Sequence, residues 1–160
     1  MQPRIEFLTE KKLVGHFLSM SLQNNRTFEL WSGFMPKKRL VKNRIGTSLY
    51  SLQVYPKSKR ESVFSPAKEF VKWAAVEVSE FENDDFETMI LPAGEYAVFI
   101  HKGPPSGFPE TMNAIFNGWL PNSGYELDNR PHFELLGEKY KNNHPDSEEE
   151  VWIPIKEIKE

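Results

Sequence analysis

The sequence contains no cysteine, and this absence excludes both a disulfide framework and a zinc site built on thiolates. It also lacks any apolar run approaching the ~20 residues of a membrane span, and residues 1–15 lack the apolar core of a signal peptide. A chain of 160 residues can bury a sufficient hydrophobic core without a disulfide or metal staple. We therefore expect one domain covering residues 1–160, in the cytoplasm and with no membrane partner.

Sequence motifs that mark common enzyme classes are missing as well. There is no Gly-x-Ser-x-Gly elbow, no His-Glu-x-x-His helix, no dinucleotide fingerprint and no phosphate-binding loop. The four histidines stand at positions 16, 101, 132 and 144, without the spacing of metal ligands. We expect neither a metal nor another cofactor.

The chain also has no excess of positive charge. Its 20 basic and 23 acidic residues give a net charge of −3. A nucleic-acid-binding protein needs a concentrated basic surface to contact phosphates. We expect no direct nucleic-acid binding.

Aromatic residues, in contrast, are abundant. Four Trp, five Tyr and twelve Phe are many for a chain of this length. Such rings either fill a core or line a pocket for an organic ligand.

The two halves of the chain resemble each other in four blocks that occur in the same order. The matched segments are 5–21 with 86–103, 28–36 with 113–121, 49–54 with 132–137, and 72–78 with 151–157. The first pair predicts strand, turn and strand in each half. The last pair aligns Trp73 with Trp152. This ordered similarity predicts an internal duplication, with repeat one at about 3–80 and repeat two at about 84–158.

Each repeat has the pattern of a βαββ unit. Apolar residues recur at helical spacing over 27–35 and about 109–120, and Pro36 and Pro121 are expected to stop the two helices. The predicted fold class is α+β. Two duplicated βαββ units would form a pseudo-twofold domain with two antiparallel sheets, two main helices and a central ligand groove.

Glu134 is the most informative difference between the repeats. It interrupts an apolar strand, where the first repeat has Ser51. Strand alternation separates Glu134 from Phe133 and Leu135, which point to the opposite face. In one interpretation Glu134 simply faces solvent on an antiparallel sheet.

The final strands of the repeats favour a second interpretation. Alternation puts Trp73 and Trp152 on the face opposite to their aliphatic neighbours. If helices cover the aliphatic face, both indoles share the other face with Glu134. A carboxylate between large rings is a good site for a cationic or hydrogen-bonding ligand.

Other candidate ligand-binding residues carry a weaker signal. His101 could be a polar group of the pocket or an acid/base, although a histidine at a strand end is more often structural. Tyr96 could donate a hydrogen bond to a ligand or belong to the core. Trp119 has helical spacing and could lie in the core or in the pocket wall. Ser51 and Phe99 complete the set of expected lining residues.

Several segments together resemble the GyrI-like domain over nearly the whole chain. They are Leu91 to Phe99, Gly118 to Pro121, Gly124 to Leu127, Phe133-Glu134, Val151 to Ile155 and, in the first repeat, Trp73 to Val78. The resemblance implies a duplicated βαββ fold whose groove binds small, often hydrophobic and cationic molecules. The same domain is the effector-sensing half of AraC-type and MerR-type regulators.

The resemblance also implies roles for particular residues. The central glutamate of the family's pocket matches Glu134. Trp152 takes the place of the aromatic residue before the family's Ile-Pro-Ile, where tyrosine is usual, and Trp73 matches the aromatic residue of the first repeat.

We expect a stand-alone protein, monomeric or homodimeric, that binds or sequesters hydrophobic, possibly cationic compounds. The family implies two alternatives. One is a metal-independent hydrolase that opens strained cyclopropane rings of toxic compounds with Glu134 as the catalytic residue, and the other is a gyrase-inhibitor-like interaction module. The residues alone leave open whether the protein is an enzyme.

Overall fold

The computed structural model describes residues 1–56 and 65–159. The strands are β1 (Arg4–Leu8), β2 (Lys11–Met20), β3 (Leu49–Val54), β4 (Phe70–Val78), β5 (Glu87–Leu91), β6 (Gly94–Lys102), β7 (Tyr125–Leu127), β8 (His132–Leu136) and β9 (Glu148–Glu157). The two main helices are α1 (Thr27–Phe34) and α2 (Phe108–Asn113), which continues into a π-helical segment, Ala114–Trp119. Short 3-10 turns, Met35–Leu40 and Leu120–Asn122, follow and carry Pro36 and Pro121. The first helix thus ends next to Pro36, as predicted, whereas the second changes from α-helical to π-helical geometry at Ala114, before Pro121.

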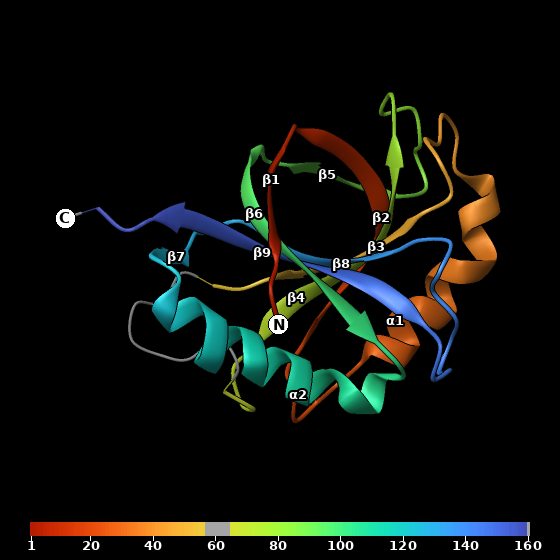
Figure 1. Ribbon diagram of the computed structural model, residues 1–160. Helices are drawn as coiled ribbons and strands as arrows, with labels where there is room; N and C mark the ends of the chain where they lie inside the picture. The colour runs from red at the N-terminus through yellow and green to blue at the C-terminus, as the bar shows by residue number, and fades with distance from the viewer. Residues whose placement is uncertain (57–64, 160) are drawn as a thin grey trace.

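The strands form one continuous antiparallel sheet in the order β1-β6-β9-β8-β3-β4-β2-β5, and β7 pairs with the end of β9 (Figure 1). The mixed α/β architecture with two helices was predicted correctly. The prediction of two separate sheets is wrong, because β3 pairs with β8 over five residues and joins the halves. The middle pair of this β3–β8 ladder is formed by Ser51 and Glu134.

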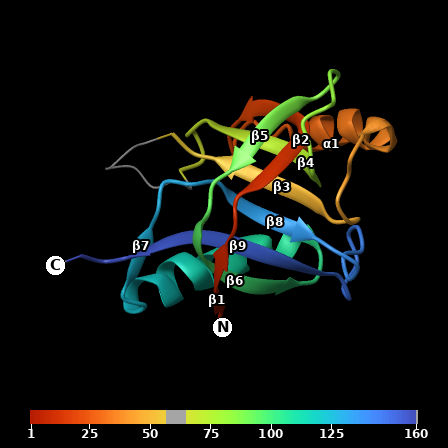
Figure 2. The same ribbon diagram turned by 90° about the horizontal axis from the view of Figure 1, so that it is seen from above.

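The first strand of each half crosses to the other half. β1 pairs with β6, and β5 pairs with β2, so the strands predicted on either side of a turn do not pair with each other. A two-residue hairpin requires positive φ at its turn. Neither Thr9-Glu10 nor Pro92-Ala93 has it. After β1 and after β5, the chain therefore passes from one half of the sheet to the other instead of forming a hairpin (Figure 2).

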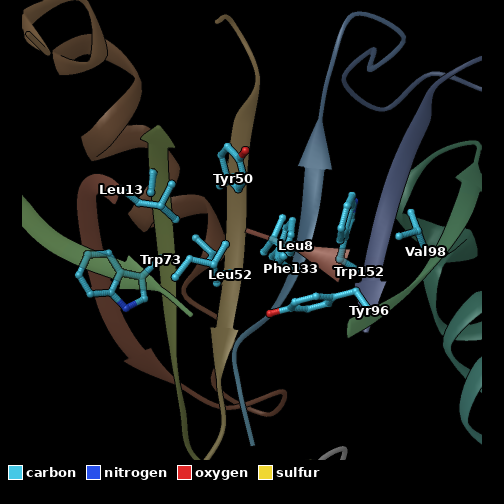
Figure 3. Packing of buried hydrophobic residues seen from close by; sticks show 11 residues of the cluster. Leu8, Leu13, Tyr50, Leu52, Trp73, Tyr96, Val98, Phe133 and Trp152 are labelled. Carbon is cyan, nitrogen blue, oxygen red and sulfur yellow. The ribbon is translucent and has the colours of Figure 1, made fainter. Parts of the chain in front are cut away.

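The two faces of the sheet are both covered by apolar clusters. On one face, α1 packs with Leu30 and Phe34 against Ala74 and its neighbours, and the α2 segment packs against Val151 and Ile153. The third cluster lies on the opposite face and is rich in aromatic rings (Figure 3). Among the described residues, no helix has the length and apolarity needed to cross a membrane.

The alignment of Trp73 with Trp152 is wrong by two positions. Tyr50 pairs with Ala75, whereas Phe133, which the sequence matches to Tyr50, pairs with Trp152. Trp152 therefore takes the sheet position that Ala75 has in the other half. Trp73 pairs with Leu52 and contacts the ring of Phe17 at 4.9 Å between centroids.

Candidate functional site

Glu134 lies on the face of the sheet that carries the helices, not with the tryptophans. Phe133 pairs with Trp152, and Glu134 pairs with Val151. Because directly opposite residues share a face and successive residues alternate, Glu134 and Trp152 point to opposite sides. The prediction that Trp73, Trp152 and Glu134 share a face is therefore wrong. Its premise assigned Phe133 to the helix-covered face, but Phe133 belongs to the cluster on the other face.

Polar side chains occupy the helix-covered face of the central strands, between the two helix-packing clusters. We call this set the polar centre, and it consists of Ser51, Gln53, Lys72, His132, Glu134 and Glu149. Pairs in the register link these residues: Ser51 with Glu134, and Gln53 with both His132 and Lys72. The apolar clusters beneath α1 and α2 contain none of them.

Glu134 is buried, with 7% of its surface exposed. Its Oε1 accepts a hydrogen bond of 3.0 Å from Nε2 of Gln53. Burial raises the pKa of Glu134 from 4.5 to about 7, because a carboxylate loses its hydration there. The charge of Lys72 and the Gln53 hydrogen bond oppose this rise, while Glu149 adds to it.

Lys72 and Glu149 complete the charges of the polar centre. Nζ of Lys72 donates a hydrogen bond of 3.2 Å to Oγ1 of Thr27 at the start of α1. Burial lowers the pKa of Lys72, against the attraction of Glu134 and Glu149. Burial also raises the pKa of Glu149 to about 7, which Lys72 counteracts. Among the described residues, Lys72 is the cation whose charge opposes the rise in pKa of both Glu134 and Glu149.

Aromatic rings flank the polar centre. The Tyr55 ring meets the His132 ring edge-on at 4.9 Å between centroids, and the Phe116 ring lies nearly parallel to His132 at 6.2 Å. Burial, with a contribution from Arg130, lowers the pKa of His132 to about 3, so this imidazole is neutral. The carboxylate therefore does have aromatic neighbours, although not the ones that the sequence indicated.

Of the remaining predicted residues, Ser51 belongs to the polar centre, His101 lies at its border, where it pairs with Glu149, and the others lie elsewhere. His101 is buried and its ring nitrogens contact Oγ1 of Thr111 at 2.7 Å and the carbonyl oxygen of Pro104 at 3.2 Å, which secures the start of α2. Phe99 and Trp119 contact each other, ring edge to face, in the apolar cluster beneath α2.

Tyr96 belongs to the aromatic cluster on the opposite face of the sheet. It is fully buried, and its hydroxyl donates a hydrogen bond of 2.8 Å to the carbonyl oxygen of Pro131. The guanidinium of Arg130 stands 4.7 Å from the centre of its ring.

Sequence reasoning missed Gln53, Lys72, His132, Glu149 and Tyr55. A usable signal was present for two of them. Gln53 follows Ser51 at strand spacing, and His132 precedes Glu134 in the same way, so both central strands alternate polar with apolar residues. If the two central strands are placed side by side with Ser51 opposite Glu134, their polar residues predict one polar strip across the middle of the sheet.

Within residues 1–56 and 65–159, no group of three or more His, Asp or Glu side chains is placed to hold a metal ion.

A family model described as a GyrI-like small molecule binding domain matches residues 1–156. No curated protein matches the chain. Among solved structures, SAV2435 bound to tetraphenylphosphonium has a TM-score of 0.71 and 16% identity, covering 98% of this chain and 94% of that one. The EcmrR C-terminal domain has a TM-score of 0.69 and 16% identity, with 98% of each chain covered.

A hydrolase encoded by lin2189 from Listeria innocua has a TM-score of 0.60 and 12% identity, covering 97% of this chain and 92% of that one. At these identities the three structures establish similarity of fold alone.

Proposed function

The chain belongs to the GyrI-like small-molecule-binding family, and from this premise we propose that it binds hydrophobic cations with Glu134 as their counter-charge. The observation that carries the proposal is the buried carboxylate of Glu134 on the central strand, with a pKa of about 7. Such a carboxylate is costly to keep charged without a partner, so a cation beside it is strongly favoured. We further propose a binding module without direct nucleic-acid contact, in keeping with its net charge of −3.

The charges around Glu134 support a ligand with one positive charge. Lys72 balances only one of the two carboxylates, Glu134 and Glu149. A monocation takes the place of the proton that the second carboxylate otherwise holds near neutral pH. The rings of Tyr55, His132 and Phe116 offer apolar and π surface beside that charge. SAV2435, which shares the fold, binds tetraphenylphosphonium, a compound of this class.

A duplicated origin accounts for the arrangement of the strands. β3 and β8 lie at the centre, β4 and β9 flank them, β2 and β6 follow, and β5 and β1 form the edges. Matching elements thus stand at equal distances from the pair of Ser51 and Glu134. We propose a single domain of two βαββ units, in which only the second unit supplies the central carboxylate.

Calorimetric titration with tetraphenylphosphonium tests the ligand proposal. Glu134→Gln keeps the shape of the side chain but removes its charge, and we expect affinity to fall by about tenfold or more, equivalent to at least ~1.4 kcal/mol. Glu110→Gln removes the same charge from an exposed position on α2 and should leave affinity unchanged. Equal affinities of the wild type and the Glu134→Gln variant would exclude Glu134 from the site.

Hydrolysis is a second candidate function, favoured by one observation. A carboxyl group with a pKa of about 7 can both take and return a proton near neutral pH, as a general acid or base must. Turnover of an electrophilic cyclopropane compound that disappears in the Glu134→Gln variant would support it. Stoichiometric binding without product, measured by mass spectrometry, would rule it out for that compound. The gyrase-inhibitor-like alternative stays a prediction.

A further inference from the structure

A cavity of about 320 Å³ opens on the face of the sheet opposite to Glu134. Tyr50, Phe133, Leu135 and Trp152 line it, and Glu6 of β1 and Lys11 of β2 stand beside it. We propose that this cavity is a second binding site, which takes a small aromatic cation independently of the ligand bound at Glu134. The cavity shares no lining residue with the polar centre.

The aromatic lining of the cavity is fixed in place by its neighbours. The Phe133 and Trp152 rings are stacked, with centroids 5.2 Å apart and planes inclined by 15°. Tyr96 packs its edge against both rings, and Tyr50 contacts Phe133 (Figure 3). Rings held in this way lose little freedom when a flat ligand packs on them.

The structure already holds a cation at the indole. The guanidinium of Arg4 lies 5.9 Å from the centre of the Trp152 ring. Glu150 fixes both groups, accepting hydrogen bonds from Arg4 Nη2 at 2.8 Å and from Trp152 Nε1 at 3.0 Å. A ligand cation would find the same π face and the same carboxylate that attract Arg4.

Carboxylates outnumber cations around the cavity. Among the described residues, three carboxylates at or near the cavity, Glu6, Glu77 and Glu150, form ion pairs with two cations: Arg4 pairs with Glu6 and Glu150, and Lys11 lies 3.4 Å from Glu77. The site therefore favours a ligand with one positive charge over a neutral or anionic one.

Two features of the cavity narrow the class of ligand. Its volume is at the lower end of the roughly 300–1,000 Å³ of small-molecule pockets, which suits one or two rings. The hydroxyl of Tyr50, 3.5 Å from Oε1 of Glu77, adds a polar contact at its edge. We therefore expect a one- or two-ring aromatic ammonium compound.

The test uses benzyltrimethylammonium as the probe and benzenesulfonate as its charge-reversed control, with binding followed by NMR chemical shifts of the tryptophan indole N–H groups. We expect saturable binding of the cation that shifts the Trp152 signal, and no binding of the sulfonate. Glu6→Lys should weaken binding by about fivefold, because it reverses a charge beside the cavity. Arg4→Met should strengthen it about two- to fivefold, because it frees the π face of Trp152.

Both substituted side chains are more than two-fifths exposed, so the fold should tolerate the changes. The Glu134→Gln variant serves as the control for independence, and the probe should shift its Trp152 signal as it does in the wild type. Loss of this Trp152 shift in that variant, no saturable binding in any variant, or equal affinity in the Glu6→Lys and Arg4→Met variants would each overturn the proposal. Failure of tetraphenylphosphonium to respond to Glu134→Gln would refute only the function proposed above.

Discussion

Raising the pH from about 5 to about 8 should lower the free energy of unfolding. The Glu134→Gln substitution should remove much of this pH-dependent loss of stability. In the folded state the pKa of Glu134 is about 7, against 4.5 for an unperturbed carboxyl group. The folded state therefore holds this proton more tightly than the unfolded state does. The resulting stability is fully present below pH 4.5 and is lost as the pH rises to about 7.

The size of the effect follows from the two pKa values. At about 1.4 kcal/mol per pH unit, a carboxyl group with a pKa of about 7 instead of 4.5 costs about 3 kcal/mol of unfolding free energy above pH 7. Glu134 is buried, so solvent does not screen this cost. The pKa of Glu149 is raised in the same direction, but its partial exposure makes its contribution smaller.

Urea unfolding at about pH 5 and about pH 8 measures the effect. The Glu134→Gln variant should be more stable than the wild type at the higher pH, by about 2–3 kcal/mol, with nearly equal stability at the lower pH. Glu110→Gln, on the exposed surface of α2, should reproduce the wild-type profile. Parallel pH profiles for the wild type and the Glu134→Gln variant would refute a buried, protonating carboxyl group at this position.

Two further substitutions probe the polar centre and the sheet. Lys72→Met removes an ammonium group whose charge acts on both Glu134 and Glu149, so tetraphenylphosphonium affinity at about pH 8 should rise about threefold or more. Unchanged affinity in a calorimetric titration would contradict the shared charge. Gly15→Ala would place a Cβ atom 1.9 Å from the carbonyl oxygen of Ala74, so β2 and β4 must separate. The expected loss is about 2 kcal/mol or more in urea unfolding, and a loss below about 0.5 kcal/mol would contradict the close approach of the strands.

Element types were largely predictable because their signals are local. Helical spacing of apolar residues and the two prolines identified α1 and α2, and β-prone runs identified most strands. Strand pairing depends on contacts between distant residues, which the sequence does not display directly. The crossing of β1 and β5 between the halves is such a feature, and only the poor turn residues Thr9-Glu10 and Pro92-Ala93 indicated it.

The site was predicted in its central residue but not in its surroundings. Glu134 stood out because one polar residue interrupts an apolar strand. Its face could not be predicted, since both faces of the sheet carry apolar clusters and Phe133 and Val151 are equally buried on opposite sides. The alternation of hydrophobic and polar residues identifies the buried face of a strand only when the opposite face of the sheet is exposed to water. The two-residue error in aligning Trp152 arose from the same lack of contrast along β9.

The exchange of edge strands has a consequence for how the protein folds. β1 pairs with a strand that follows it by about ninety positions, as in the pair of Arg4 and Val98, and β5 returns to β2 near the start of the chain. Neither half can satisfy its own sheet edge, so a fragment ending after β4 would leave β1 without a partner and β2 open to another chain. We expect the two halves to unfold together in a single transition, and a separated half to associate with a second copy by strand exchange.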